Sequence, residues 1–331
     1  MPGRAVVIGA RGYLGRAVVP VLTESGFDVT GLGRRAPAST SARRFLACDA
    51  TNSAALRSAL AGMDVVVNLM AGPPSAMVRV AENLGDNLGR QKALRVVQLS
   101  SLAVLGQMSG VLNETCKPTP AKLRAYGAAK LAGERHLLEV PGVAGRCVII
   151  RPGCIYGPGS PQWVDRLCRL LLAGRLGWLG QEGAGLSPLV HVRDVAQAIA
   201  TTMQPAADAG IYHLLSPETL TWNVYFRRLA RRLDIDTLTS MHVARLEAET
   251  WITGPARALL SRVMGQPTDR ITPAMRHLFR SAALPASVRR PLLPAGRFIP
   301  HEIGIAEAVT AFLANRATEA RRTRKRREAA A

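Results

Sequence analysis

The sequence contains 331 residues, of which 48% are hydrophobic and 20% are charged, and its formal net charge at pH 7 is +20. Apolar residues recur along the whole chain, so the composition excludes a disordered or fibrous protein and predicts a buried core. At about 100 to 200 residues per domain, the length predicts one main body and a smaller second region.

The N-terminal apolar run at 5–8 ends at a glycine before the core of a signal peptide could develop. The most apolar later stretches, at 65–71 and 170–179, are too short or too interrupted for a membrane-spanning helix, which requires about 20 residues. The five cysteines are odd in number and include no Cys-x-x-Cys pair, which favours neither a disulfide framework nor a zinc site. We therefore expect a cytoplasmic protein without a bound metal.

Most of the positive charge comes from arginine, and six basic residues lie in the run 321–327. A basic tail over 316–331 could hold phosphate groups or anionic lipid. A solvated helix end is the simpler interpretation, so the tail is assigned no function and no nucleic-acid partner is expected.

The first 35 residues follow the order strand, tight turn, helix, strand. The apolar run at 5–8 precedes a glycine-rich turn at 9–15, an amphipathic stretch at 16–25 and a second apolar run at 27–32. Such a unit, with parallel strands, opens a doubly wound α/β sheet. The alternation of strands and helices continues to about residue 151. Its further predicted elements are strands at 44–48, 65–69, 95–99 and 148–151 and helices at 53–61 and 125–139.

A second region begins after residue 151, where proline and glycine interrupt the alternation. The runs 189–192 and 211–215 are interpreted as later strands of the main sheet, and Asp194 as the cap of a helix over 195–203. We predict an α/β protein with a Rossmann-type doubly wound parallel sheet and a smaller, mostly helical C-terminal substrate region. The predicted boundaries are 1–151 with 189–215 for the dinucleotide-binding domain, 152–188 with 216–315 for the substrate-binding region, and 316–331 for the basic tail.

Three glycines, Gly9, Gly12 and Gly15, lie between the first strand and the first helix. Gly9 permits a sharp turn, Gly12 lets the backbone approach a phosphate, and Gly15 allows the helix to pack closely on the strand. The N–H groups of the first helical turn can then bind a dinucleotide pyrophosphate. Three glycines could also form a merely structural turn, but their position between strand and helix favours the dinucleotide.

The end of the second strand distinguishes NAD from NADP. An acidic residue there would bind the ribose hydroxyls of NAD, whereas this chain has Gly33, Arg34 and Arg35. The glycine leaves space for a 2′-phosphate, and the guanidiniums of Arg34 and Arg35, joined by Arg11, can pair with that phosphate. We therefore expect NADP as the cofactor, with NAD as the alternative.

Tyr126 and Lys130 are four residues apart at the start of a predicted helix, so their side chains share one face. A tyrosine pKa of about 10 makes it a poor proton carrier at neutral pH, but a neighbouring ammonium favours the phenolate. Upstream, Ser100 and Ser101 end an apolar strand at the sheet edge where open α/β sheets bind ligands. Ser101 could bind a substrate carbonyl, or the serines could simply end the strand or cap a helix.

Seven segments of the chain carry a resemblance to a known family. They are residues 9–15 (GARGYLG), 49–51 (DAT), 64–71 (DVVVNLMA), 99–106 (LSSLAVLG), 126–130 (YGAAK) with Glu134, 151–159 (RPGCIYGPG) and 190–196 (VHVRDVA). In this order, and over about residues 5–230, the sequence resembles the short-chain dehydrogenases/reductases, specifically their extended, NAD(P)-dependent epimerase/dehydratase branch.

The resemblance implies roles for particular residues. Ser101 and Tyr126 would hold and protonate the reacting oxygen, and Lys130 would also bind the nicotinamide ribose. Residues 49 and 50 would lie by the adenine, 69–71 would line the cofactor cleft, and residue 152 would flank the nicotinamide. His191 and Asp194 are interpreted as structural. The complete predicted cofactor set is Gly9, Arg11, Gly12, Tyr13, Leu14, Gly15, Arg34, Arg35, Asp49, Ala50, Leu69, Met70, Ala71, Tyr126, Lys130 and Pro152.

The implied reaction is hydride transfer between the nicotinamide and a carbonyl or alcohol carbon, with Tyr126 moving the proton. A reductase or dehydrogenase is the first interpretation, a sugar or nucleotide-sugar epimerase the alternative, and an NADP-sensing regulator without turnover the second alternative. Dehydration is disfavoured because Leu102 and Ala103 stand where family dehydratases carry acidic residues. The stretch 183–188 lacks the arginine of many sugar-nucleotide enzymes, which counts against such a substrate.

Apolar residues of the second region could line a pocket for a hydrophobic carbonyl compound, with a sugar derivative as the other expected substrate. More often such residues form a core. A basic, apolar segment at 251–264 could lie on a membrane surface, although packing against the main body is the default. The resemblance also allows a homodimer. The apolar residues are Trp163, Leu167, Leu170, Leu171, Leu172, Leu176, Trp178, Leu179, Trp222, Tyr225 and Phe226.

Overall fold

The computed structural model describes residues 3–35, 42, 44–108, 110–120, 123–204, 207–263, 269–281, 283–289 and 291–328, without the side chains of 262, 284 and 323–328. The chain divides into two compact units. Unit 1 comprises Met1–Gly153, Val192–Leu215 and Leu284–Phe298, and unit 2 comprises Cys154–His191, Ser216–Ala283 and Ile299–Ala331. Met264 of the predicted membrane-surface segment and residues 329–331 of the predicted basic tail lie outside the described residues.

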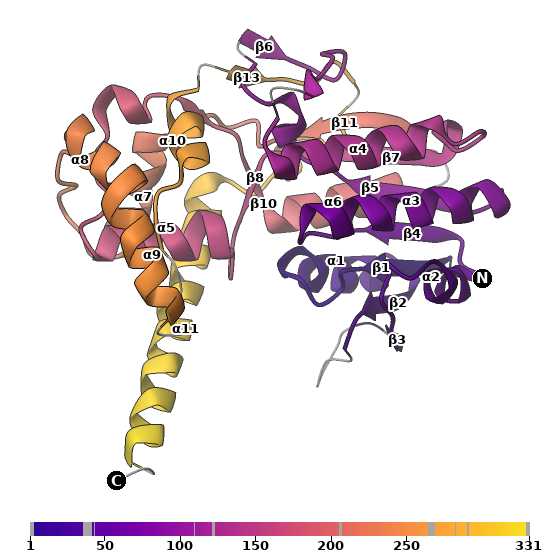
Figure 1. The fold of residues 1–331 in the computed structure, drawn as a ribbon, viewed down its shortest axis with the longest axis horizontal. Helices are drawn as coiled ribbons and strands as arrows, with labels where there is room; N and C mark the ends of the chain where they lie inside the picture. The colour runs from indigo at the N-terminus through magenta and orange to yellow at the C-terminus, as the bar shows by residue number, and fades with distance from the viewer. Residues whose placement is uncertain are drawn as a thin grey trace. The chain divides into compact units, whose positions relative to one another are not determined.

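A seven-stranded parallel sheet forms the centre of unit 1 (Figure 1), in the order β11-β7-β5-β4-β1-β2-β3. In its register, Val6 of β1 lies between Thr30 of β2 and Val66 of β4. The central strands are continuous apolar runs because helices bury both of their faces. The predicted doubly wound sheet is therefore confirmed. Its strands are β1 (Arg4–Ile8), β2 (Asp28–Gly33), β3 (Arg44–Ala47), β4 (Val65–Asn68), β5 (Arg95–Leu99), β7 (Cys147–Pro152) and β11 (Gly210–Leu214).

Helices of unit 1 pack on the sheet in two groups, α2 with α3 and α4, and α1 with α6. In the first group, Leu56, Leu84 and Leu137 share one core with residues of the central strands. The chain runs outward from β1 to β3 and then returns to β4, so the strand order reverses between β1 and β4. Open α/β sheets bind ligands at this switch point. The helices are α1 (Tyr13–Glu24), α2 (Ser53–Leu60), α3 (Pro74–Arg90), α4 (Ala125–Glu139) and α6 (Val192–Thr202).

The expectation that the run 189–192 returns to the main sheet is wrong. Strand β10 (Leu189–His191) pairs in parallel with β8 (Cys154–Tyr156) in a separate two-stranded sheet. An apolar run can predict a buried strand but cannot identify its partner, which depends on a segment 35 residues earlier, as in the pairing of Leu189 with Cys154. Helix α6 also begins at Val192, so the buried Asp194 lies in its first turn and does not precede the helix as a cap.

A late segment, Leu284–Phe298, belongs to unit 1, although the sequence gives no sign of this. Strand β13 (Ala283–Pro285) pairs with β6 (Gly110–Leu112). Glu114 fixes the segment, since its carboxylate accepts hydrogen bonds from the Ser287 hydroxyl and from the N–H groups of Val288 (3.0 Å) and His213 (2.9 Å). Burial of the Glu114 carboxyl raises its pKa, but the hydrogen bonds together outweigh burial and hold the pKa below its usual value. One carboxylate thus joins three parts of the chain.

Unit 2 is mainly helical and has an aromatic core. Trp222 and Phe279 lie with ring centroids 4.9 Å apart, and Phe226 meets Phe279 edge to face at 5.1 Å. The Tyr225 hydroxyl donates to the Trp163 carbonyl at 2.8 Å, so this core leaves the buried phenol satisfied. The elements are η4 (Pro161–Asp165), α5 (Arg166–Leu172), β9 (Leu186–Ser187), β12 (Leu220–Thr221), α7 (Trp222–Arg232), α8 (Val243–Ala248), η6 (Glu249–Thr253), α9 (Gly254–Val263), α10 (Pro273–Arg280) and α11 (His301–Glu328).

Helix α11 contains 28 residues and is predominantly polar after Leu313. Its N-terminal half packs into unit 2, where Ile305, Ala308, Val309 and Phe312 join the aromatic core. From Leu313 to Arg322 its side chains are exposed. Within the described residues, no helix combines the length and the apolar composition that crossing a membrane requires.

Candidate active site

The glycine-rich turn has the geometry that an anion-binding loop requires. Gly9 adopts a φ of +83°, and a Cβ on Gly15 would lie 2.3 Å from the Gly9 carbonyl oxygen. Gly12 is the N-cap of α1, which has neither a side-chain cap bond nor an acidic residue in its first turn. The first N–H groups of a helix lack partners within the helix and carry the positive end of its dipole. Pyrophosphate therefore fits this turn sterically and electrostatically.

Basic side chains surround the carboxyl end of β2. Arg11, Arg34 and Arg35 are all exposed, and the Arg11 guanidinium donates to the Arg35 carbonyl at 2.9 Å. Asp49 follows the neighbouring strand β3, and its hydrogen bonds with Thr51, aided by the Arg34 charge, lower the pKa of its carboxyl. A Cβ on Gly33 would lie 3.1 Å from the Phe45 ring and 3.7 Å from the Arg11 side chain, so a side chain at position 33 would press on Phe45. The charged groups at this end of β2 are the exposed arginines.

The end of β4 lies directly beside the glycine turn. The Leu69 N–H donates to the Ile8 carbonyl at 3.0 Å, and a Cβ on Gly9 would be 3.4 Å from the Leu69 carbonyl. Residues 69–71 continue from this contact, with Leu69 buried, Met70 half-buried and Ala71 exposed. The predicted pyrophosphate turn and the predicted cleft wall are therefore neighbours in space.

Lys130 connects three elements at this edge of the sheet. It lies on α4, and its Nζ donates to the Met70 carbonyl after β4 (2.9 Å) and to the Leu99 carbonyl at the end of β5 (2.8 Å). The side chain is almost wholly buried, and burial lowers the pKa of Lys130 from 10.5 to about 8, although the nearby Glu134 carboxylate opposes this shift. At neutral pH the ammonium form still predominates.

Tyr126 lies one helical turn before Lys130 and remains 43% exposed, so its phenol can reach a ligand. The Lys130 Nζ lies 5.9 Å from the centre of its ring. Directly after Tyr126, Gly127 packs against Ala103, because a Cβ there would lie 2.5 Å from the Ala103 carbonyl oxygen. Ala103 in turn donates its N–H to the Ser101 hydroxyl oxygen at 3.1 Å. The structure thus brings the first turn of α4 against the segment that begins with Ser101.

Ser101 caps the short helix η1 (Leu102–Leu105), which was one of the two sequence interpretations of this serine. Its side chain is half-buried, whereas the preceding Ser100 is buried. Capping uses only the hydroxyl oxygen as acceptor, and a hydroxyl can also donate one hydrogen bond. Ser101 is therefore available as a donor toward a ligand at the end of β5.

Glu134 and Arg151 form a buried ion pair one helical turn after Lys130. No sequence motif predicted a role for either residue. Glu134 stands one turn after Lys130 on α4 and accepts two hydrogen bonds from Arg151 on β7, from Nε at 2.9 Å and from the other guanidinium nitrogen at 2.6 Å. The Ser100 hydroxyl donates to the same carboxylate. The spacing of Tyr126, Lys130 and Glu134 at four-residue intervals is the signal that places all three on one helix face.

Two buried amides support the carbonyl groups that hold Lys130. Asn68 donates from its side chain to the Gln98 side-chain oxygen at 2.8 Å, and its own oxygen accepts the Met70 N–H at 3.1 Å. Gln98 donates to the Leu99 carbonyl at 3.3 Å. Single polar residues at the ends of apolar strands are the only sequence sign of this pair.

The remaining predicted cofactor residues lie at the same carboxyl edge of the sheet. Ala50 is buried, and its carbonyl accepts a hydrogen bond from Asn83 of α3 at 3.0 Å. Pro152 ends β7 opposite Leu214 of β11 and is buried. Tyr13 and Leu14 form the first turn of α1 with half-buried and buried side chains. Among the described residues, no group of three or more His, Cys, Asp or Glu side chains could hold a metal ion.

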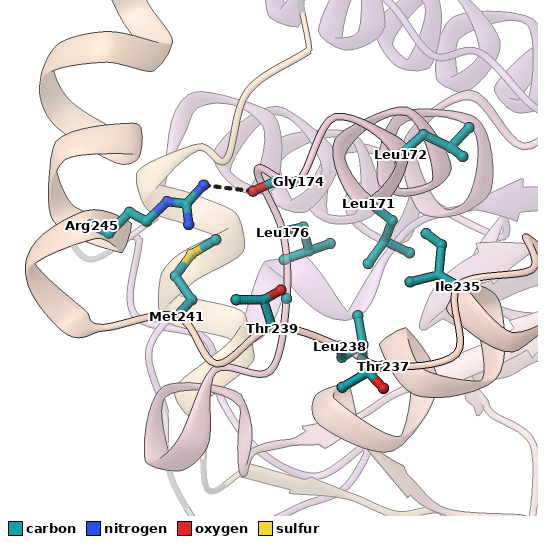
Figure 2. A pocket seen from close by; sticks show the side chains of 11 residues that line it. Leu171, Leu172, Gly174, Leu176, Ile235, Thr237, Leu238, Thr239, Met241 and Arg245 are labelled. Carbon is teal, nitrogen blue, oxygen red and sulfur yellow. Dashed lines mark hydrogen bonds between the residues drawn. The ribbon is translucent and has the colours of Figure 1, made fainter.

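Unit 2 contains a separate cavity of about 280 Å³, none of whose lining residues belongs to these motifs. Figure 2 shows apolar side chains around it, and the Arg245 guanidinium at its margin donates to the Gly174 carbonyl at 2.7 Å. Most of the apolar residues considered for a substrate pocket instead form the core of unit 2. Those that line the cavity are Leu171, Leu172 and Leu176.

Comparison with known proteins identifies the family. The model of the NAD dependent epimerase/dehydratase family matches residues 5–214, and the chain belongs to this family. It is 32% identical over 264 residues to a dTDP-4-dehydrorhamnose reductase of Streptomyces griseus, covering 73% of this chain and 82% of that protein. The predicted extended short-chain dehydrogenase/reductase family is therefore confirmed.

Solved structures agree on the fold. The structure of MoeE5 in complex with UDP-glucuronic acid and NAD aligns with a TM-score of 0.69 at 22% identity, covering 95% of this chain and all of that one. A UDP-N-acetylglucosamine 4-epimerase from Bacillus cereus aligns with a TM-score of 0.61 at 21% identity, covering 72% of this chain and 87% of that one. At these identities the likeness supports the shared fold.

Proposed function

We propose that the protein is an NADP-dependent reductase or dehydrogenase that transfers a hydride to or from a carbonyl or alcohol carbon. The observation that carries this proposal is the position of Lys130. Its ammonium donates hydrogen bonds to backbone carbonyl groups at the ends of β4 and β5 and lies over the ring of Tyr126. The likeness to the Streptomyces griseus reductase supports the same chemistry. The nicotinamide, when bound, supplies or accepts the hydride.

In the proposed reaction, Tyr126 moves the proton. The buried ammonium of Lys130 favours the phenolate form and so lowers the cost of proton transfer near neutral pH. Ser101 donates its hydroxyl hydrogen to the substrate oxygen while its own oxygen remains bound to the Ala103 N–H. In reduction, the phenol of Tyr126 gives its proton to the oxygen of the substrate, and in oxidation the phenolate accepts it.

The glycine turn and the arginines around it are proposed to hold the cofactor. The close packing of α1 on the turn, which requires a glycine at position 15, and the start of α1 without a side-chain cap support pyrophosphate binding there. Asp49 and Ala50 would contact the adenine, residues 69–71 would line the cleft, and Pro152 would flank the nicotinamide. Five free cysteines also support the proposed location in a reducing cytoplasm.

Tyr126→Phe is the most direct test of the reaction. The variant should retain NADPH binding, measured by cofactor fluorescence, and lose about 10²- to 10⁴-fold in kcat on a carbonyl substrate found by screening, measured as NADPH consumption. Because the side chain is partly exposed, removing its hydroxyl should leave the fold unchanged. Full activity of this variant would contradict the proton-transfer role.

The Arg34→Ala, Arg35→Ala double variant tests the preference for NADP. Loss of two guanidiniums should raise KM for NADPH about tenfold or more and leave KM for NADH nearly unchanged, because only NADPH carries the 2′-phosphate. Arg44→Ala, which removes another exposed arginine near the sheet edge, serves as the matched control. An unchanged ratio of NADPH to NADH efficiency would favour NAD.

An epimerase is the second candidate, because the family whose model matches the chain is the NAD dependent epimerase/dehydratase family. The substrate in the first proposal is a hydrophobic carbonyl compound or a sugar derivative, and a nucleotide sugar would fit the second. Absorbance separates the two functions, since a reductase consumes NADPH in proportion to product and an epimerase interconverts its substrates without net consumption. Product analysis by mass spectrometry would provide an independent readout.

A further inference from the structure

The segment from Val243 to Val263 forms three consecutive helical elements, α8, η6 and α9, with one buried and one exposed side. Leu246, Glu249 and Thr250 are buried and attach the segment to unit 2. The opposite side presents five large apolar side chains that are each 62–79% exposed. They are Trp251, Ile252, Leu259, Leu260 and Val263.

We call these five side chains the exposed stripe. Leu259 and Val263 are four residues apart and share one face of α9, with Leu260 next to Leu259, and Trp251 and Ile252 lie on η6, the element directly before α9. Single exposed apolar residues are ordinary on a protein surface, but a contiguous row of large ones marks an interaction surface.

Unit 2, which carries the stripe, has a net positive charge. Unit 2 carries 20 Lys and Arg against 12 Asp and Glu residues. Glu249, the acidic residue of η6, is already paired with Arg175 and Arg257. Arg257 lies on α9 itself, and its side chain is half exposed. An anionic partner is therefore attracted to unit 2.

The basic end of α11 also belongs to unit 2. Asp269, six residues after α9, forms an ion pair with Arg169 on α5, at 2.7 Å. Glu319 of α11 acts electrostatically on that same arginine. Around Glu319, α11 exposes Arg316, Arg321 and Arg322. Arg169 of α5 thus interacts both with Asp269, which follows α9 in the chain, and with Glu319 of α11.

We propose that the exposed stripe of η6 and α9, together with the basic end of α11, docks unit 2 onto an anionic lipid bilayer. A helix with aromatic and aliphatic side chains on one face and arginines near it lies in the plane of the lipid headgroups. Trp251 suits that depth because its ring is apolar and its indole N–H is polar. The arginines bind the lipid phosphates.

A second copy of the chain is the other surface that could cover the stripe. Two copies would bring two strongly positive surfaces together, since the chain as a whole has a formal charge of +20. Like charges repel and require compensation at an interface, whereas anionic lipid supplies the opposite charge. Charge complementarity therefore favours the bilayer.

The test uses the full chain and vesicles of two compositions, phosphatidylcholine alone and phosphatidylcholine with phosphatidylglycerol. We expect flotation with the anionic vesicles, little binding to the neutral ones, and weaker binding at high salt because the charges are screened. The double variant Leu259→Ser, Leu260→Ser should bind about tenfold more weakly or worse. Val111→Ser is the matched control, since Val111 is 64% exposed but belongs to β6 of unit 1.

Fluorescence provides a second readout. Of the four tryptophans, Trp222 is buried, Trp163 and Trp178 are half-buried, and Trp251 is exposed. Anionic vesicles with brominated acyl chains should quench emission in the wild type, and Trp251→Phe should remove this quenching. Failure to bind anionic vesicles, or full binding by the double serine variant, would overturn the proposal. So would a dimer in light scattering that the same double variant converts to monomers, since the occupant would then be a second copy.

Discussion

The two units bury charged groups in different ways. In unit 1, Lys130, Glu134 and Arg151 are all 3% exposed or less, and Glu134 joins Arg151 through two hydrogen bonds. In unit 2, Glu249 is buried, but the side chains of its partners Arg175 and Arg257 keep 20% and 50% of their surface. The interior of unit 2 is instead aromatic.

This difference indicates where stability and function compete. Removing three charges from water is costly, and an apolar core of the same volume is often at least as stable. Such groups are typical of functional sites, because burial and charge partners change the pKa values that chemistry depends on. The buried set in unit 1 includes the candidate catalytic lysine, whereas the buried Glu249 of unit 2 pairs with arginines that stay partly exposed.

The largest expected effect tests the buried pair of unit 1. Glu134→Gln leaves the Arg151 guanidinium buried without a full counter-charge and should lower the free energy of unfolding by about 3 to 5 kcal/mol. Urea denaturation measures this change. Asp64→Asn is the control, because the Arg4–Asp64 pair is more than half exposed and such pairs contribute about 1 kcal/mol or less. Equal losses in the two variants would contradict the difference between buried and exposed pairs.

A similar effect is expected in the core of unit 2. Trp222→Ala removes a fully buried ring that contacts Phe279 and Phe226, and it should cost about 3 to 5 kcal/mol in the free energy of unfolding. Trp251→Ala is the matched control of the same residue type. With 63% of its surface exposed, Trp251 should change stability by about 0.5 kcal/mol or less. A large loss for Trp251→Ala would mean that the stripe supports the fold.

The smallest expected effect concerns the pH dependence of stability. Because burial lowers the pKa of Lys130 to about 8 from 10.5, the unfolded chain binds one proton more than the folded protein between these pH values. The free energy of unfolding should therefore rise with pH across that window, by about 3 kcal/mol at most for one group. The difference between wild type and Lys130→Met, measured by denaturation at several pH values, isolates this contribution. A difference that is constant with pH would contradict the lowered pKa.

Most of the main sheet could be predicted from the sequence because its signals are local. Strand β5 and helix α4 have their predicted bounds, and β1, β2, β3, β4 and β7 differ from theirs by one or two residues. The predictions that failed depend on distant pairing. Residues 189–191 of the predicted strand 189–192 are extended, but they pair with β8 outside the main sheet, and Val192 already begins α6. The return of residues 284–298 to unit 1 depends on hydrogen bonds to Glu114 and His213, which no local pattern encodes.

The candidate site could likewise be predicted from the sequence only in part. Motif spacing identified the glycine turn, Ser101, Tyr126 and Lys130. It did not identify the partners of the lysine, since its ammonium binds backbone carbonyl groups, which every residue carries. Nor did it identify the supporting amides of Asn68 and Gln98, which meet across neighbouring strands. Their roles require the register of the sheet.

By itself, the sequence determined the order of strands and helices, the glycine turn and the family, because periodicity and motif spacing act over a few tens of residues. Only the tertiary structure decided which apolar residues fill a core and which remain on the surface. Trp222 and Trp251 are the same residue type on helical segments, yet one is wholly buried and the other is exposed. The physical reason is that burial depends on the neighbours that folding brings from distant parts of the chain, and those neighbours also determine the pKa of Lys130.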